Sequence, residues 1–212
     1  EVGDADLSLL SYLDCCEHAF LEYRKRVPDV DYHATFQYLS FHTPFGGMVK
    51  GAHRTMMRKM TKAKPTDIEQ DFLQRVQPGI TYSQRIGNTM GANVLLSLAS
   101  TIDQGQFSTP KRVGCFSYGS GCCSEFYSGV VTAEGKSRQG HFAIEQQLNQ
   151  RYQLSIDEYE ALLRGSGAVR FGTRNTKSDF GFIPEALTTC QGQQRLFLDG
   201  IHEYHRRYKW LS

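Results

Sequence analysis

The chain has 212 residues, of which 40% are hydrophobic and 22% charged, a composition typical of a globular protein with a sizeable core. No apolar run reaches the roughly 18 residues that a membrane-spanning helix needs. No basic segment followed by an apolar one opens the chain, which argues against a signal peptide. A formal net charge of +2 does not by itself indicate nucleic acid as a partner.

The first residue is Glu1 rather than Met, and the opening segment is predicted to begin a helix, so we expect a fragment or a processed chain. None of the six cysteines has CxxC spacing, which argues against a zinc or iron–sulfur site, and we expect no metal. Because there is no secretory signal, we expect free thiols and a cytoplasmic location.

The first predicted element is a helix over residues 5–27. Asp4 or Asp6 could cap its start, and Pro28 stops it. Its apolar side chains recur at spacings of three and four residues, which is one helical stripe, formed by Leu9, Leu13, Cys16, Phe20, Tyr23 and Val27.

A strand is predicted over the aromatic-rich residues 34–43, and Pro44 ends it. A second helix follows, with an apolar stripe from Phe45 to Met60. Basic residues lie largely off that stripe, with no acid among them from residue 50 to 64. The run is either a solvated helix face or a docking surface for an acidic partner. Its members are Lys50, Arg54, Arg58, Lys59, Lys62 and Lys64.

Residues 67–77 are predicted as a short helix that ends before Pro78 and Gly79. The next predicted helix begins near Gly87 and Asn88. Its apolar residues indicate a buried helix, and they are Val94, Leu95, Leu98 and Ala99.

Two strands around a Gly-Ser-Gly turn are predicted over residues 111–132. Residues 142–164 are polar and helix-prone, and the last fifty residues mix Gly-containing loops with a final amphipathic stretch. Strands between several helices predict an α/β layered arrangement.

Three segments could carry chemistry. His42 in FHTPF (41–45) lies at a strand–helix junction, where scaffolds expose reactive groups, although a satisfied structural histidine has the same pattern. Asn88 in IGNTMG (86–91) could cap a helix or hold a water or a carbonyl. The glycines of FSYGSG (116–121) could present N–H groups to an oxyanion, or only form a tight hairpin.

Together, FHTPF, GNT before an apolar helix, and VGCFSYGSG resemble the 3-hydroxy-3-methylglutaryl-CoA (HMG-CoA) synthase family in order and approximate spacing. The resemblance runs from residue 1 to about residue 132. It implies an α/β, thiolase-like layered αβαβα fold, of which residues 1–212 would be the C-terminal half. It also implies an acyltransferase that adds an acetyl-derived carbanion to a β-ketoacyl thioester.

Matched residue by residue, the resemblance makes His42 the acid/base histidine and Asn88 a residue that orients the acceptor. It gives the backbone N–H of Ser117 a place in an oxyanion hole. Substrate contacts fall on Phe45, Gly119, Ser120 and Lys50. None of the six cysteines stands at a matching motif. The nucleophilic cysteine and the catalytic glutamate would therefore belong to a preceding N-terminal half, which the activity requires.

Primary-metabolism members carry a lysine after the FHxP motif that can meet CoA phosphates, whereas Gly47 stands here. This departure favours the polyketide-associated relatives, which perform β-branching on acyl carrier proteins. Such carriers are acidic, so we expect them to dock on Arg54, Arg58 and Lys59. We expect an acyl-phosphopantetheine or CoA thioester as substrate, no separate cofactor, a homodimer, and neither nucleic acid nor membrane as a partner.

Three other functions stay open. A primary-metabolism HMG-CoA synthase would use CoA substrates. A ketoacyl synthase would also take a histidine and an asparagine from this half, but FSYGSG favours the HMG synthase. A binding or scaffold module that keeps the fold is the non-enzymatic alternative, against which the presence of His42 and Asn88 argues.

Overall fold

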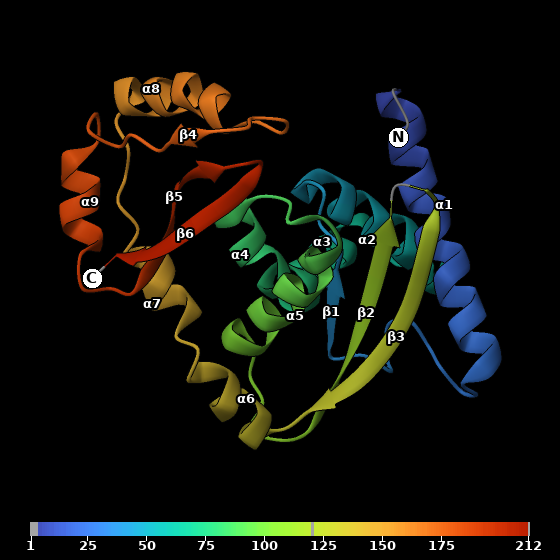
Figure 1. The fold of residues 1–212 in the computed structure, drawn as a ribbon. Coiled ribbons are helices and arrows are strands. Elements are labelled where there is room, and N and C mark those ends of the chain that lie inside the picture. Colours follow the sequence, from blue (N-terminus) through green and yellow to red (C-terminus); the bar gives the residue numbers. More distant parts are fainter. Residues whose placement is uncertain (1–3, 120, 212) are drawn as a thin grey trace. The chain divides into compact units, whose positions relative to one another are not determined.

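The structure is a computed structural model that describes residues 4–119 and 121–211. It contains two compact units, Glu1–Leu148 and Asn149–Ser212. In Figure 1 the first unit runs from blue to olive and the second is orange and red.

Helix α1 spans Ala5–Arg26, close to its predicted bounds. The side chain of Asp4 caps it by accepting a hydrogen bond from the Leu7 N–H at 2.8 Å, which chooses Asp4 over Asp6. Cys16 and Phe20 of the predicted stripe are buried, as is Tyr12, which lies beside it.

A three-stranded sheet forms the centre of the first unit, with β1 (Tyr38–Phe41), β2 (Lys111–Gly119) and β3 (Cys123–Val131) in that order. β1 is parallel to β2, and β2 is antiparallel to β3. The two predicted strands at 111–132 are confirmed. β1 is shorter than predicted, because only four residues have a ladder partner.

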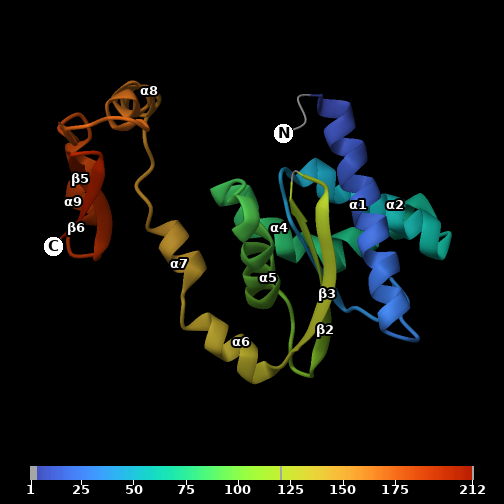
Figure 2. The ribbon, with the colours of Figure 1, turned by 45° about the vertical axis from the view of Figure 1, so that its right-hand side comes forward.

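Helices cover both faces of this sheet (Figure 2). On one face α1 and α2 (Gly46–Thr61) enclose an aromatic core in which Phe20 packs edge-on against Tyr32, Phe36 and Phe126. Such ring pairs contribute about 0.5–1.5 kcal/mol each beyond area burial. On the other face a smaller cluster joins Tyr38, Val94, Phe107, Val113 and Cys115.

The prediction of a break at Pro78 and Gly79 is wrong. Helix α3 (Pro65–Asp71), a π-helix at Phe72–Val76 and α4 (Gln77–Ile86) follow one another without a loop. Pro78 lies in the first turn of α4. A Cβ at Gly79 would lie 2.8 Å from the hydroxyls of Ser97 and Thr101, so glycine allows close packing there.

Helix α5 spans Asn93–Gln104, after a 3-10 turn at Met90–Ala92. Its buried face is largely polar, contrary to the apolar face predicted: Leu95 is 60% exposed, although Val94 is buried. The reason is hydrogen bonding. The Phe41 N–H donates to Ser97 Oγ at 3.1 Å, and the hydroxyls of Ser40 and Thr101 lie 2.8 Å apart. Small hydroxyl side chains thereby join α5 closely to β1.

Two short helices, α6 (Ala133–Gly140) and α7 (Ile144–Asn149), follow the sheet. The second unit contains α8 (Ile156–Ser166), β4 (Thr176–Lys177), α9 (Pro184–Cys190), β5 (Arg195–His202) and β6 (His205–Leu211). A 3-10 turn at Gly167–Val169 follows α8. The strands form an antiparallel sheet of order β4-β5-β6. A capping box of Ser155 and Glu158 starts α8.

The described residues thus have the α/β architecture that the sequence predicts. Within them, even the 22-residue α1 lacks the apolar character that a membrane crossing needs.

Candidate active site

His42 follows the last residue of β1, and the surrounding backbone fixes its main chain. Its N–H donates to the Phe116 carbonyl at 2.8 Å, which extends the pairing of β1 with β2. Its carbonyl accepts a hydrogen bond from the Tyr12 hydroxyl at 2.7 Å. Since Tyr12 is fully buried on α1, that helix and the sheet together set the position of His42.

The imidazole of His42 is 6% exposed, and its buried Nδ1 has no hydrogen-bond partner in the part of the chain that the structure describes. Burial lowers its pKa, so the ring is neutral at pH 7. A buried nitrogen without a partner costs about 1–3 kcal/mol, a cost that a ligand carbonyl or hydroxyl would relieve. A neutral histidine held this way can exchange a proton with a bound group.

Asn93 connects the two loops that carry His42 and Asn88. Its Oδ1 accepts the Thr43 N–H at 2.6 Å, and its Nδ2 lies 3.4 Å from both Ser83 Oγ and the Gly87 carbonyl. Asn93 is fully buried. The Asn93 side chain therefore connects Thr43, which follows His42, with Gly87, which precedes Asn88.

Asn88 is exposed, and its Oδ1 accepts the Met90 N–H at 2.9 Å. This bond spans two residues within the turn, and the N-cap residues of the 3-10 turn and of α5 are Thr89 and Ala92, so Asn88 caps neither. Gly87 has a φ of +88°, which favours glycine, so the turn before Asn88 depends on that residue.

Ser117 lies within β2, opposite Glu125 of β3. The Phe116 carbonyl points to β1, where it accepts the His42 N–H. In a planar trans peptide the following N–H points the opposite way, so the Ser117 N–H faces β3. Gly119 ends β2 opposite Cys123, and Ser120 lies outside the described residues. The turn after Gly119 is therefore a better candidate than Ser117 for the oxyanion donor.

The remaining predicted substrate residues differ in their surroundings. Phe45 is 59% exposed at the start of α2. The Lys50 ammonium lies 2.6 Å from Glu69 Oε1 and 5.5 Å from the centre of the Phe72 ring. The Lys50 ammonium is thus paired with Glu69 in this structure.

The predicted docking residues lie on α2. Arg54 and Arg58 are exposed, and the described residues provide no ion pair to either. Lys59 pairs with Glu17 of α1. Two of the three predicted positions thus present a positive charge to solvent.

A buried cluster of polar and charged side chains that the sequence did not reveal connects α2 with α3 and the π-helix. His53 is fully buried, with its Nε2 2.8 Å from Asp71 Oδ2 and its Nδ1 3.2 Å from the Tyr32 hydroxyl. Arg75 donates to both oxygens of Asp71 at 2.8 Å. Burial alone would raise the pKa of Asp71, but His53 and Arg75 outweigh it and bring the pKa to about 2. A histidine within the apolar stripe of a predicted helix was the available signal.

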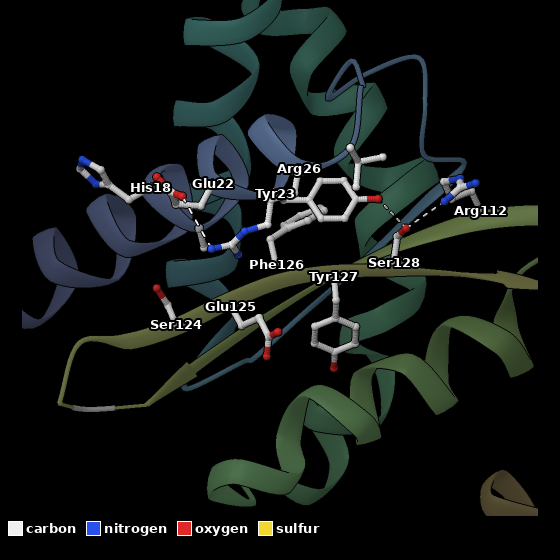
Figure 3. Close-up of a pocket in the computed structure, with 12 residues that line it drawn as sticks. His18, Glu22, Tyr23, Arg26, Arg112, Ser124, Glu125, Phe126, Tyr127 and Ser128 are labelled. Carbon is white, nitrogen blue, oxygen red and sulfur yellow. Dashed lines mark hydrogen bonds and ion pairs between the residues drawn. The ribbon is translucent and has the colours of Figure 1, made fainter. Parts of the chain in front are cut away.

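An open groove of about 700 Å³ lies between α1 and β3, apart from the motifs (Figure 3). The Ser128 hydroxyl lies 2.7 Å from the Tyr23 hydroxyl and accepts from Arg112 at 3.0 Å. Glu22 and Arg26 also line the groove, so it has both negatively and positively charged side chains. None of the predicted site residues lines it.

The family model for the hydroxymethylglutaryl-coenzyme A synthase C terminal matches residues 52–210. The chain belongs to the HMG-CoA synthase family. It is 66% identical over its whole length to the polyketide biosynthesis 3-hydroxy-3-methylglutaryl-ACP synthase PksG of Bacillus subtilis, and covers 50% of that protein. It is 32% identical to the hydroxymethylglutaryl-CoA synthase of Enterococcus faecalis, over 75% of this chain and 40% of that one.

Solved HMG synthases have the same fold as this family member. The curacin biosynthetic pathway HMG synthase in complex with apo donor-ACP matches with a TM-score of 0.96 and 61% identity, over 99% of this chain and 52% of that one. The structure of PksG matches with a TM-score of 0.95 and 65% identity. The prediction of the thiolase-like α/β fold is confirmed. The chain spans about half the length of these relatives.

Proposed function

We propose that this chain is the C-terminal half of an HMG synthase that forms a carbon–carbon bond on carrier-protein-bound thioesters in polyketide β-branching. The observation that carries the proposal is the buried, neutral His42, held by Tyr12 and connected through Thr43 and Asn93 to the Asn88 loop. The 66% identity to PksG supports the polyketide class over a CoA-dependent enzyme or a ketoacyl synthase.

In the proposed reaction, a carbanion derived from an acetyl thioester adds to the β-ketone of the acceptor. A ring N–H of His42 polarises that ketone and passes its proton to the alkoxide as it forms. Asn88 orients the acceptor, and N–H groups of the turn after Gly119 stabilise the thioester oxyanion. The nucleophilic cysteine and the carbanion-forming glutamate come from the N-terminal half.

Exposed apolar side chains beside the motifs support the need for that half. Phe45 ends the FHTPF motif, Met90 lies two residues after Asn88, and Leu95 lies on α5, with exposed fractions of 59%, 73% and 60%. Large apolar side chains that are left exposed can mark an interaction surface. The expected homodimer and cytoplasmic location remain part of the proposal, and sedimentation of the full-length protein measures the first.

The reaction is tested on the chain preceded by an N-terminal half, either its own upstream sequence or that of PksG. Acetyl-carrier protein is supplied as donor and a β-ketoacyl carrier protein as acceptor, and intact-protein mass spectrometry follows both. His42→Ala should leave acetylation of the enzyme intact and abolish condensation. His18→Ala, at an exposed histidine of α1, is the matched control and should change neither. Loss of acetylation in a folded His42→Ala protein would contradict the assigned role.

Carrier docking is tested by charge reversal on α2. Arg54→Glu with Arg58→Glu should lower kcat/KM for the carrier-bound acceptor several-fold more than for a free thioester, because rim charges mainly steer association. Arg24→Glu with Arg26→Glu, which makes the same total charge change on α1, serves as the control. Equal losses on both acceptors would favour the CoA-dependent alternative.

A further inference from the structure

The fold brings together two thiols that are far apart in the sequence, Cys15 in the middle of α1 and Cys122 in the turn between β2 and β3. The Cys15 Sγ donates to the Cys122 carbonyl at 3.8 Å. One residue into β3, the Ser124 hydroxyl donates to the Cys15 carbonyl at 3.3 Å. Two reciprocal hydrogen bonds therefore hold this part of α1 against the turn.

The two thiols differ in accessibility. Cys122 is exposed and has a φ of +55°, whereas Cys15 is half-buried. Burial raises the pKa of Cys15, and the Cys122 thiol raises it further. A disulfide requires the two Cα atoms to lie within about 7 Å. The Cys15 Sγ lies 3.8 Å from the Cys122 carbonyl oxygen, so the two residues are neighbours in space, as a disulfide requires.

Each cysteine has an immediate neighbour that lacks this arrangement. Cys16 is 1% exposed and faces the aromatic core. Cys123 is exposed but lies in β3, paired with Gly119. In each vicinal pair, one cysteine therefore takes part in the contact between α1 and the turn, and its neighbour does not.

We propose that Cys15 and Cys122 form a reversible oxidation site, which hydrogen peroxide closes to a disulfide and a small thiol reopens. The exposed Cys122 thiolate attacks one peroxide oxygen, the O–O bond breaks, and the leaving hydroxide takes up a proton to give water and a Cys122 sulfenic acid. Cys15 sulfur then attacks the Cys122 sulfur. The S–O bond breaks, and the departing hydroxide takes the Cys15 proton as a second water. The two thiols lose two hydrogens, and the peroxide is reduced.

Closure would attach α1 covalently to the turn at the end of FSYGSG. The same helix already holds His42 through Tyr12. An effect of closure on turnover rests on the proposed function, whereas formation of the disulfide does not, so the test below uses no acyl substrate.

The full-length protein is treated with hydrogen peroxide, its remaining thiols are alkylated, and its peptides are mapped by mass spectrometry. We expect one Cys15–Cys122 cross-linked peptide that dithiothreitol removes, together with slower amide hydrogen exchange at residues 121–124. A Cys122–Cys123 disulfide, or a Cys122 sulfinic acid beside an alkylated Cys15, would overturn the proposal.

Matched serine variants sharpen the result. Cys122→Ser should abolish the cross-link, and Cys123→Ser should retain it. Circular dichroism of the reduced variants establishes that both are folded. If Cys122→Ser does not fold, the wild-type peptide map still decides, because it identifies the bonded pair directly. Loss of the cross-link in both variants would count against a specific pair.

Discussion

The two units of this chain differ in how deeply most of their aromatic residues are buried. In the first unit Phe20, Phe36 and Tyr12 are completely buried and pack edge-on against other rings. In the second, Phe171 is 99% exposed and Trp210 66% exposed. Both have similar kinds of side chain, so burial, not composition, distinguishes them.

The difference in burial between the two units indicates which of them fixes the geometry of the site. The first unit has a continuous core, and the residues that hold His42 are part of it. The buried apolar side chains of the second unit are few, among them Ile183 and Ile201, and its hairpin is supported by surface ion pairs such as Lys209–Asp199. Changes should therefore be costly in the first unit and tolerated in the second.

Truncation of a core ring should have the largest effect. Phe20 lies 5.2 Å from the Tyr32 ring and 5.3 Å from the Phe126 ring, measured between centroids. Phe20→Ala should lower the free energy of unfolding by about 3–5 kcal/mol. Phe171→Ala should change it by less than about 0.5 kcal/mol. Urea unfolding followed by amide exchange measures both, and similar losses would remove the contrast between the units.

Acid should weaken the first unit through Asp71. Its folded pKa of about 2 lies below its ordinary value, so its contribution is present above about pH 4 and is lost as the pH falls toward 2. A shift of this size corresponds to about 2 kcal/mol. Burial also lowers the pKa of His53, so its contribution is likewise lost as the pH falls below its ordinary value.

Urea unfolding at several pH values tests this dependence. Asp71→Asn should remove the decline below about pH 4 and should itself be destabilising, because it leaves Arg75 without its carboxylate. Trp210 is the single tryptophan of the chain, so its fluorescence follows the second unit. A parallel loss at Trp210 would mean that the units unfold together.

Replacement of Asn93 should have an intermediate effect. Asn93→Ala leaves the buried Thr43 N–H without its acceptor, at a cost of about 1–3 kcal/mol. Asn88→Ala removes only exposed bonds with Met90, one from its N–H and a long one to its sulfur, and should cost about 1 kcal/mol or less. Thermal unfolding of both variants measures which of them loses more stability. A greater loss of stability in Asn88→Ala would reverse the roles assigned to the two amides.

The smallest effect is expected in the second unit. Lys209→Ala removes an ion pair 2.8 Å long whose lysine is 62% exposed, and such pairs contribute about 0–1 kcal/mol. Trp210 fluorescence during urea unfolding checks it. A loss comparable to that of Phe20→Ala would show that surface pairing, not a core, holds this unit together.

Hydrophobic spacing predicted α1, α2 and the β2–β3 hairpin because each has an apolar face against one core. It failed for α5, whose buried face uses serine and threonine hydroxyls to meet β1. It also failed at Pro78 and Gly79, where close packing against Ser97 and Thr101 requires a residue that usually breaks helices.

The motifs marked the loops of the site but not the residues that hold them. His42 and Asn88 stood out because of their unusual local patterns. Tyr12 and Asn93 did not, since each acts through a hydrogen bond to a backbone group 30 and 50 positions away. Contacts of that range depend on tertiary packing, which periodicity does not encode.

A substitution at Gly79 would affect the position of the Asn88 loop during evolution. It is the contact point of α4 with α5, and α4 ends directly before the Gly87–Asn88 loop. A single added methyl group would have to displace the Ser97 and Thr101 hydroxyls, which bond to β1, or push α4 away from α5. Selection on the position of Asn88 therefore extends to a residue nine positions upstream. A substitution there would resemble an active-site mutation in its effect while touching no part of the motif.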